Sequence, residues 1–216
     1  MRMLSGLVCA GLSIATLSAT KAPVPPTNNQ SQPAAAEVRD GSVTFNVETN
    51  VFAVSVHGES KDLDAKVRVH ESAEGMRLEQ IEAVVPVKSL STGMKLRDDH
   101  MRKYIFQTPD GQVPDVRFTA ERAECSGAGA NGAAKCVASG QLAIRGTARP
   151  FVMELAVTRE NDLFRVQGDG TVKLSAYGIE RPSQFGVKTA DDVKLHLELS
   201  ARSAAPSATL SAGKKQ

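Results

Sequence analysis

The sequence predicts an all-β fold, an extended antiparallel β-barrel of about eight strands with a short helix at about residues 94–104. Apolar residues recur at every second position through most of the chain, which is the period of a strand with one buried face. No predicted helix is long enough to cover that face, so the strands must close on one another or pack as two sheets. We favour closure, although periodicity alone leaves a sandwich open.

The strands are expected to follow one another as a meander, because turn sequences such as Thr49-Asn50 and Glu74-Gly75 separate the alternating runs. Gly168 and Gly170 fall on an inward face, where a missing side chain permits curvature or leaves room inside. Apolar alternation predicts strands over residues 43–47, 52–57, 65–70, 78–87, 116–120, 142–144, 151–157, 164–174 and 193–199.

The polar positions between the apolar ones carry many charges, among them Lys66, Arg68, Lys194 and Glu198. On a membrane-spanning barrel these side chains would face lipid, at a cost of about 2–4 kcal/mol for each basic residue near the midplane. The charged face therefore belongs in water. We expect an apolar interior and no stable membrane insertion.

The chain is expected to contain one folded domain over residues 38–202. Residues 1–22 read as a secretory signal peptide, since Arg2 precedes an uncharged apolar run that ends in small residues. An uncleaved membrane anchor is the alternative, but the run is short for a bilayer span. Residues 23–37 are a disordered Pro-rich linker by composition, and 203–216 a disordered tail. We expect a periplasmic or secreted protein.

Charge balance excludes one class of partner. The formal net charge is +2, from 26 Lys and Arg against 24 Asp and Glu. Arg2 and Lys21 lie in the expected signal peptide, so 24 basic residues face 24 acidic ones in the remainder. A neutral protein has no net electrostatic attraction for nucleic acid or for an anionic membrane surface, so no nucleic-acid partner is expected.

Two cysteines, Cys125 and Cys136, remain once the segment that holds Cys9 is set aside. They lie at the ends of two predicted strands with the flexible loop SGAGANGAAK between them. An even pair in an oxidising compartment predicts a disulfide. Two free thiols are the alternative, and no histidine lies near either cysteine to suggest a metal site.

The charged helix does not predict catalysis. Asp98, Asp99 and His100 are adjacent, and on a helix they point about 100° apart, so all three cannot bind one ion. We expect the two acids to pair with neighbouring basic side chains or to cap local backbone. The sequence also has no nucleophile elbow, phosphate-binding glycine loop or zinc-type cysteine spacing. We therefore expect no enzyme activity, no metal and no cofactor.

Several motifs together resemble the YceI-like family of small secreted lipid-binding proteins. They are VPVKSLSTGMKLRDDHMRKYIF, PDVRFTAE, GQLAIRGTARPFVMEL and VKLSAYGIERPSQFGVKTADDVKLHLEL, spread over about Val38 to Arg202. The resemblance implies a lipocalin-like barrel that holds a long apolar chain, such as a polyisoprenoid, a quinone tail or a fatty-acid-like amphiphile. It implies no catalysis. The start of the domain and the Cys125–Cys136 hairpin depart from the family pattern, which leaves the ligand open.

On this reading, a polar ligand head would meet Arg97, His100, Arg145 and Tyr177 at the barrel mouth. The same apolar residues could instead fill a solid core, as in most small barrels. The predicted lining comprises Phe45, Phe52, Val54, Phe118, Leu142, Ile144, Phe151, Met153, Leu155, Phe164, Val166, Leu195 and Leu197.

Three functions follow from the sequence. The first is a carrier or store for an apolar lipid, which would be the only bound molecule. The second is a secreted stress-response or interaction module with a filled, ligand-free barrel. The third is an enzyme acting on a lipid head group, for which His100 is the one candidate. The sequence leaves a homodimer open.

Overall fold

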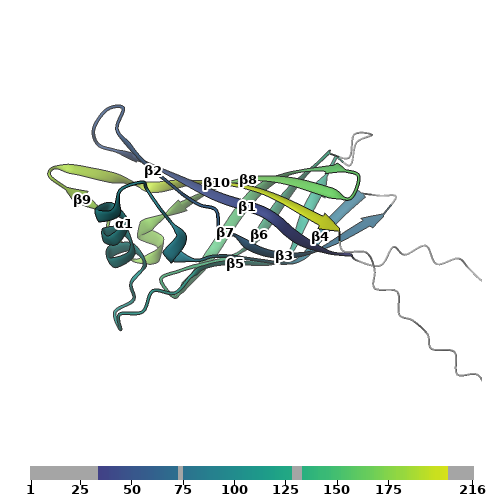
Figure 1. Cartoon of the computed structure of the whole chain (residues 1–216), viewed down its shortest axis with the longest axis horizontal. Coiled ribbons are helices and arrows are strands. Elements are labelled where there is room, and N and C mark those ends of the chain that lie inside the picture. The colour runs from purple at the N-terminus through teal and green to yellow at the C-terminus, as the bar shows by residue number, and fades with distance from the viewer. Residues whose placement is uncertain (1–33, 73–74, 128–132, 204–216) are drawn as a thin grey trace, which may run out of the picture.

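The computed structural model describes residues 34–72, 75–127 and 133–203. Within them an antiparallel sheet curls into an elongated barrel (Figure 1). The strands are β1 (Ala34–Thr49), β2 (Ser55–Ser60), β3 (Asp64–Ser72), β4 (Gly75–Val85), β5 (Val116–Ser126), β6 (Ala133–Ile144), β7 (Thr147–Glu160), β8 (Leu163–Lys173), β9 (Ser183–Gln184) and β10 (Val187–Ser203). The helical segments are η1 (Val87–Ser89), α1 (Lys95–Met101), η2 (Arg102–Phe106) and η3 (Leu174–Tyr177).

The ring closes through the pairing of the first long strand with the last. Going round the barrel, the order is β1, β3, β4, β5, β6, β7, β8 and β10, and β10 pairs with β1 again. The β1–β10 ladder runs from the pair Ala36 and Ser203 to the pair Thr49 and Thr189. Strand β2 lies beside the second half of β1, and β3 beside its start. The predicted all-β barrel and its short helix are therefore confirmed.

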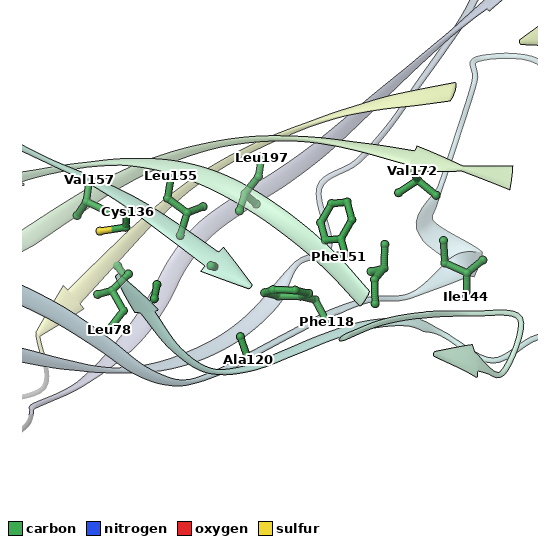
Figure 2. Close-up of a cluster of buried hydrophobic side chains, with 14 of the residues drawn as sticks. Leu78, Phe118, Ala120, Cys136, Ile144, Phe151, Leu155, Val157, Val172 and Leu197 are labelled. Atoms are coloured by element: carbon green, nitrogen blue, oxygen red, sulfur yellow. The ribbon is translucent and has the colours of Figure 1, made fainter. Parts of the chain in front are cut away.

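Strand register places the apolar positions on the inside. Phe45 lies opposite Leu195, and Phe118 opposite Leu142, so successive strands present apolar side chains at the same level. In Figure 2 the labelled side chains from several strands converge on one another. The rings of Phe118 and Phe151 meet edge to face, with centroids 5.8 Å apart. The core is thus a single cluster inside the barrel.

Inward glycines make room for neighbouring side chains. A Cβ on Gly168 would lie 2.8 Å from Leu155 Cδ2, and one on Gly170 would lie 2.5 Å from Phe151 Cζ. Both glycines lie on β8, beside the larger residues of β7. Glycine here serves packing, because the large side chain of one strand occupies the space that a small residue leaves on the next.

Gly140 is the glycine with the least room, because a Cβ there would lie 2.2 Å from the backbone oxygen of Thr119. Backbone cannot rotate away as a side chain can. We predict that Gly140→Ala lowers the free energy of unfolding by about 1–3 kcal/mol, as overpacking generally does, measured by urea denaturation. Ser139→Ala, on the exposed face of the same strand, is the control, and equal stability of the two variants would contradict the prediction.

Two sequence expectations are corrected by the fold. Strand β1 begins at Ala34, inside the segment expected to be linker, because residues of that segment extend the pairing with β3 and β10. Residues 52–54 do not form a strand. They lie in the β1–β2 turn, where Thr49 Oγ1 donates to the carbonyl oxygen of Val54 at 2.8 Å and Ala53 has a φ of 60°. Local turn bonding thus outweighs the alternating pattern.

The barrel has two different ends (Figure 1). One end carries α1, the β1–β2 turn and β9, and we call it the capped end. The disulfide between Cys125 and Cys136 joins the end of β5 to the start of β6, away from the capped end. A crosslink over a sequence separation of 11 stabilises the hairpin by roughly 2–3 kcal/mol in the chain-entropy model. A disulfide is consistent with an oxidising compartment.

The expected signal peptide, residues 1–22, lies outside the described residues, as does most of the linker and nearly all of the tail. Among the helices that are described, none combines the length and the apolar character needed to cross a membrane.

Candidate functional site

The inner wall of the barrel is packed unevenly. On β5 and β6 the inward side chains are almost all buried, as at Ala123, Ala138 and Leu142, which are 0%, 1% and 4% exposed. On β1, β3, β4 and β10 many inward side chains are only half-buried although they belong to the same apolar cluster. An inward side chain of a closed barrel keeps contact with solvent only where the interior is not filled. Unfilled space therefore lies against the β10–β1–β3–β4 wall.

The half-buried inward residues of this cluster form one apolar set. It supplies dispersion contacts and hydrophobic burial. Its members are Val38, Val43, Phe45, Val67, Ile81, Ala83, Val85, Val193, Leu195 and Leu199.

An open cavity of about 1030 Å³ adjoins this wall. Its apolar lining includes Val38, Leu63, Val166 and Leu199, from β1, the β2–β3 turn, β8 and β10. Most of its lining is polar and exposed, including Asp40, Arg165 and Glu198 on the outer face. The hollow therefore spans both faces of the sheet here, and its volume is not that of the barrel interior alone.

Small residues line the opposite wall. Ala120, Ala123, Ala134 and Ala138 are inward on β5 and β6 and buried, so the space beside them is filled, and a Cβ on Gly140 would meet the Thr119 backbone. Sequence reasoning did not identify this alanine lining. Its only signal was the small residue at every second position of residues 134–140, namely Ala134, Cys136, Ala138 and Gly140.

Most of the predicted lining residues do lie inside. Phe45, Met153, Val166 and Leu195 are half-buried there, and contact of any of them with a ligand stays a prediction. The fully buried ones are Phe118, Leu142, Ile144, Phe151, Leu155, Phe164 and Leu197.

Phe52 and Val54 were wrongly placed in the lining. Phe52 is 98% exposed and Val54 is 45% exposed, in the β1–β2 turn outside the barrel. The period-two pattern continues through a turn whose side chains face solvent. In that turn the pattern therefore does not show which side chains face the interior.

Asp98 holds the cap onto the barrel. Its carboxylate accepts hydrogen bonds from the backbone nitrogen of Thr92 at 2.7 Å and from Ser91 Oγ at 3.0 Å, and Thr92 Oγ1 donates to it as well. Ser91 in turn exchanges two backbone hydrogen bonds with Glu59 of β2, at 2.8 and 2.9 Å. Helix α1 is thus joined through Asp98 and Ser91 to the barrel wall.

Arginines complete the cap. Arg97 donates to Thr92 Oγ1 and to the Thr92 carbonyl oxygen at 2.8 and 2.7 Å. Arg102 donates to Asp99 at 3.2 Å and to the carbonyl oxygen of Leu90 at 3.3 Å. The expectation that the adjacent acids of this segment pair with basic neighbours or cap local backbone is confirmed. Apolar side chains beneath the cap, Val87, Leu90, Phe106 and Ile179, are all buried.

The pKa of Asp98 lies below its ordinary value. Burial acts to raise the pKa, but the hydrogen bonds from Thr92 and Ser91 and the nearby Arg102 cation outweigh that effect. A carboxyl whose pKa is lowered by folding stabilises the folded state above its unfolded pKa. That stabilisation is lost as the pH falls through the lowered folded pKa. The cap is therefore expected to loosen in acid.

We predict that Asp98→Asn destabilises the cap by about 1.5–3 kcal/mol at neutral pH, the usual worth of hydrogen bonds to a charged group. The measurement is amide hydrogen exchange of residues 87–106. The difference from the unaltered protein should shrink as the pH drops through the folded pKa of Asp98. Asp99→Asn is the control, because the Asp99 side chain is 51% exposed and should change exchange far less. A pH-independent difference would contradict the prediction.

The four predicted mouth residues all belong to segments at the capped end, but no hydrogen bond or ion pair joins any two of them. Tyr177 is buried and donates from its hydroxyl to the carbonyl oxygen of Leu142 at 3.1 Å, and burial raises its pKa. His100 packs edge to face on Tyr104, and Arg145 lies in the β6–β7 turn with a φ of 53°. Arg97 is engaged with Thr92. A role in binding a ligand head stays a prediction for each.

Metal-ligating residues do not gather in the part of the chain that the structure describes, where no group of three or more His, Cys, Asp or Glu side chains could hold an ion. On the outer face, His196 Nδ1 lies 2.8 Å from Asp169 and His196 Nε2 lies 3.4 Å from Glu198. These contacts hold the histidine on the surface.

A closed antiparallel barrel with an apolar interior and a helical cap at one end has the architecture of a lipocalin-like protein. A family model described as the YceI-like domain matches residues 35–201, most of the chain. The protein belongs to the YceI-like family.

Solved structures share this fold. BcnA of Burkholderia cenocepacia is 19% identical, with a TM-score of 0.56, covering 74% of this chain and 95% of that one. A polyisoprenoid binding domain from Saccharophagus degradans, implicated in plant cell wall breakdown, is 14% identical with a TM-score of 0.55, covering 80% and 100%. The Campylobacter jejuni YceI protein is 19% identical with a TM-score of 0.55, covering 72% and 90%. No curated protein matches the sequence.

Proposed function

We propose that the protein binds a long apolar chain, such as a polyisoprenoid, a quinone tail or a fatty-acid-like amphiphile, inside the barrel. The half-buried apolar wall on β10, β1, β3 and β4 is the observation that supports this most strongly. A filled barrel would bury those side chains completely. The polyisoprenoid binding domain from Saccharophagus degradans, which has the same fold, supports the same class of ligand.

The chemistry of the wall suits an apolar ligand. A chain with about 20 methylene equivalents would gain on the order of 16 kcal/mol from burial, at about 0.8 kcal/mol for each methylene. Much of this gain is offset by the lost freedom of the chain. Since burial of apolar surface is non-directional, the length and shape of the space would set specificity.

The protein would act in an oxidising compartment, the periplasm or outside the cell, as a carrier or store of its ligand. The disulfide between Cys125 and Cys136 and the secretory character of the N-terminal sequence support that location. No catalytic step is proposed, because a bound hydrocarbon chain offers no reacting group to the apolar wall.

The direct test is mass spectrometry of an organic-solvent extract of protein purified from its native source. A co-purified polyisoprenoid, quinone or fatty-acyl lipid in stoichiometric amount is the expected result. Repeatedly clean extracts, with no binding of a fluorescent fatty acid, would favour instead the interaction module with a ligand-free barrel.

A substitution inside the half-buried wall tests the location of the ligand. Ala83 is inward and half-buried on β4, opposite Phe118. We predict that Ala83→Trp weakens binding of a fluorescent long-chain fatty acid by roughly 15- to 50-fold. The indole would displace two or three methylenes, at about 0.8 kcal/mol each.

Val152→Trp is the matched control, because Val152 is 52% exposed on the outer face of β7 and should bind as the unaltered protein does. Circular dichroism would establish that both variants fold. Unchanged affinity in a folded Ala83→Trp variant would place the ligand elsewhere.

A further inference from the structure

Exposed apolar side chains gather at the capped end of the barrel. Phe52 is 98% exposed and Phe185 is 97% exposed, in the β1–β2 and β9–β10 turns. Figure 1 shows both turns at the end that carries α1. Met94, Leu96 and Tyr104, at and beside α1, are between 57% and 63% exposed. Two phenylalanines in almost complete contact with water contribute nothing to the core.

The two turns form one rigid unit, because Asn50 joins them. Its backbone nitrogen donates to the Lys188 carbonyl oxygen at 2.9 Å, and its Oδ1 accepts from the Lys188 nitrogen at 2.8 Å. Its side-chain Nδ2 donates to the Gly186 carbonyl oxygen at 3.2 Å. Phe52 lies two residues after Asn50, and Phe185 directly precedes Gly186. We call these the paired turns.

Phe185 is an unfavourable residue for its position. It has a φ of 49°, in the left-handed region that glycine and asparagine adopt more readily than a large side chain. A backbone outlier that brings no packing gain points to a functional role.

We propose that the paired turns dock on a lipid bilayer, with Phe52 and Phe185 inserted at the boundary between head groups and acyl chains. The segment from Asn50 to Val54 carries no charge, and neither does Phe185-Gly186-Val187. Lys188, exposed at the base of the turns, lies where it can reach a lipid phosphate. The contact is apolar and needs no net protein charge.

The size of the surface favours a membrane over a second copy of the chain. The two phenylalanines together can bury about 300–500 Å² on one protomer, whereas a stable protein interface buries about 800 Å² of each partner. Protruding turns also present edges rather than a flat, complementary face. Two aromatic tips suffice only for a shallow, reversible contact, in agreement with the expected absence of stable insertion.

This docking goes beyond the proposed ligand binding. It would orient the barrel so that its capped end faces the membrane. The two can be separated by experiment. Vesicle binding reports the paired turns, and binding of a soluble fluorescent fatty acid reports the interior.

The chain contains no tryptophan, so a single introduced indole is a clean probe. Phe52→Trp and Phe185→Trp are mixed with vesicles of phosphatidylcholine and phosphatidylglycerol. We expect a blue shift of emission in both and quenching by lipids brominated on their acyl chains. Val152→Trp, on the barrel wall, should show neither effect. Equal behaviour of all three variants, or no response in the turn variants, would overturn the inference.

The double variant Phe52→Ser/Phe185→Ser should sediment with these vesicles at least roughly tenfold less than the unaltered protein. It should still bind the fatty acid, because neither side chain lies in the barrel. Undiminished sedimentation would overturn the inference. So would an emission shift that follows protein concentration without vesicles, since that would mean self-association. If the unaltered protein binds vesicles but does not bind the fatty acid, only the proposed ligand binding would be contradicted.

Discussion

Pairing of β1 with β10 is the constraint on which the rest of the structure depends. Without it the sheet would be an open ribbon with two unpaired edges, which tends to associate with other strands. Closure fixes every inward side chain at a definite level of the ring, because a shift of one residue would turn the apolar set outward. The uneven packing of the interior has a physical meaning only within this closed ring. In an open sheet, half-buried apolar residues would be ordinary.

The two walls of the barrel differ in packing, and the difference suits one wall to stability and the other to ligand binding. On the β5–β6 wall the inward side chains, small ones such as Ala123 and large ones such as Phe118, are almost all buried, and its hairpin is crosslinked by the disulfide. The β10–β1–β3–β4 wall keeps larger side chains that are only half-buried. A fully packed wall opposite a wall with partly exposed apolar side chains suits a barrel that keeps its shape whether or not a ligand is bound.

Strand periodicity was enough to predict an antiparallel all-β fold, most of the inward residues and the charged exterior, but it favoured a closed barrel over a sandwich without deciding between them. It failed at Phe52 and Val54, where the alternation continues through a turn that Thr49 closes by hydrogen bonds to Val54. Parity also cannot distinguish a buried inward residue such as Phe118 from a half-buried one such as Phe45. That difference depends on the sizes of residues on other strands, which become neighbours only when the ring closes.

The cap shows the same limit of sequence reasoning. The acids and bases between Arg97 and Arg102 were expected to pair locally, and they do. Their connection to β2 through Ser91 and Glu59 could not be foreseen, because it joins segments that β3 and β4 separate in the sequence.

That connection has a mechanical consequence. Strand β2 starts directly after the turn that carries Phe52. The strand contains Glu59, whose backbone is hydrogen-bonded to that of Ser91. Ser91 binds the carboxylate that anchors the helix. The turn, the strand and the cap therefore lie on one continuous path of covalent and hydrogen bonds, along which a displacement of the aromatic turn would act on the helix at the barrel end.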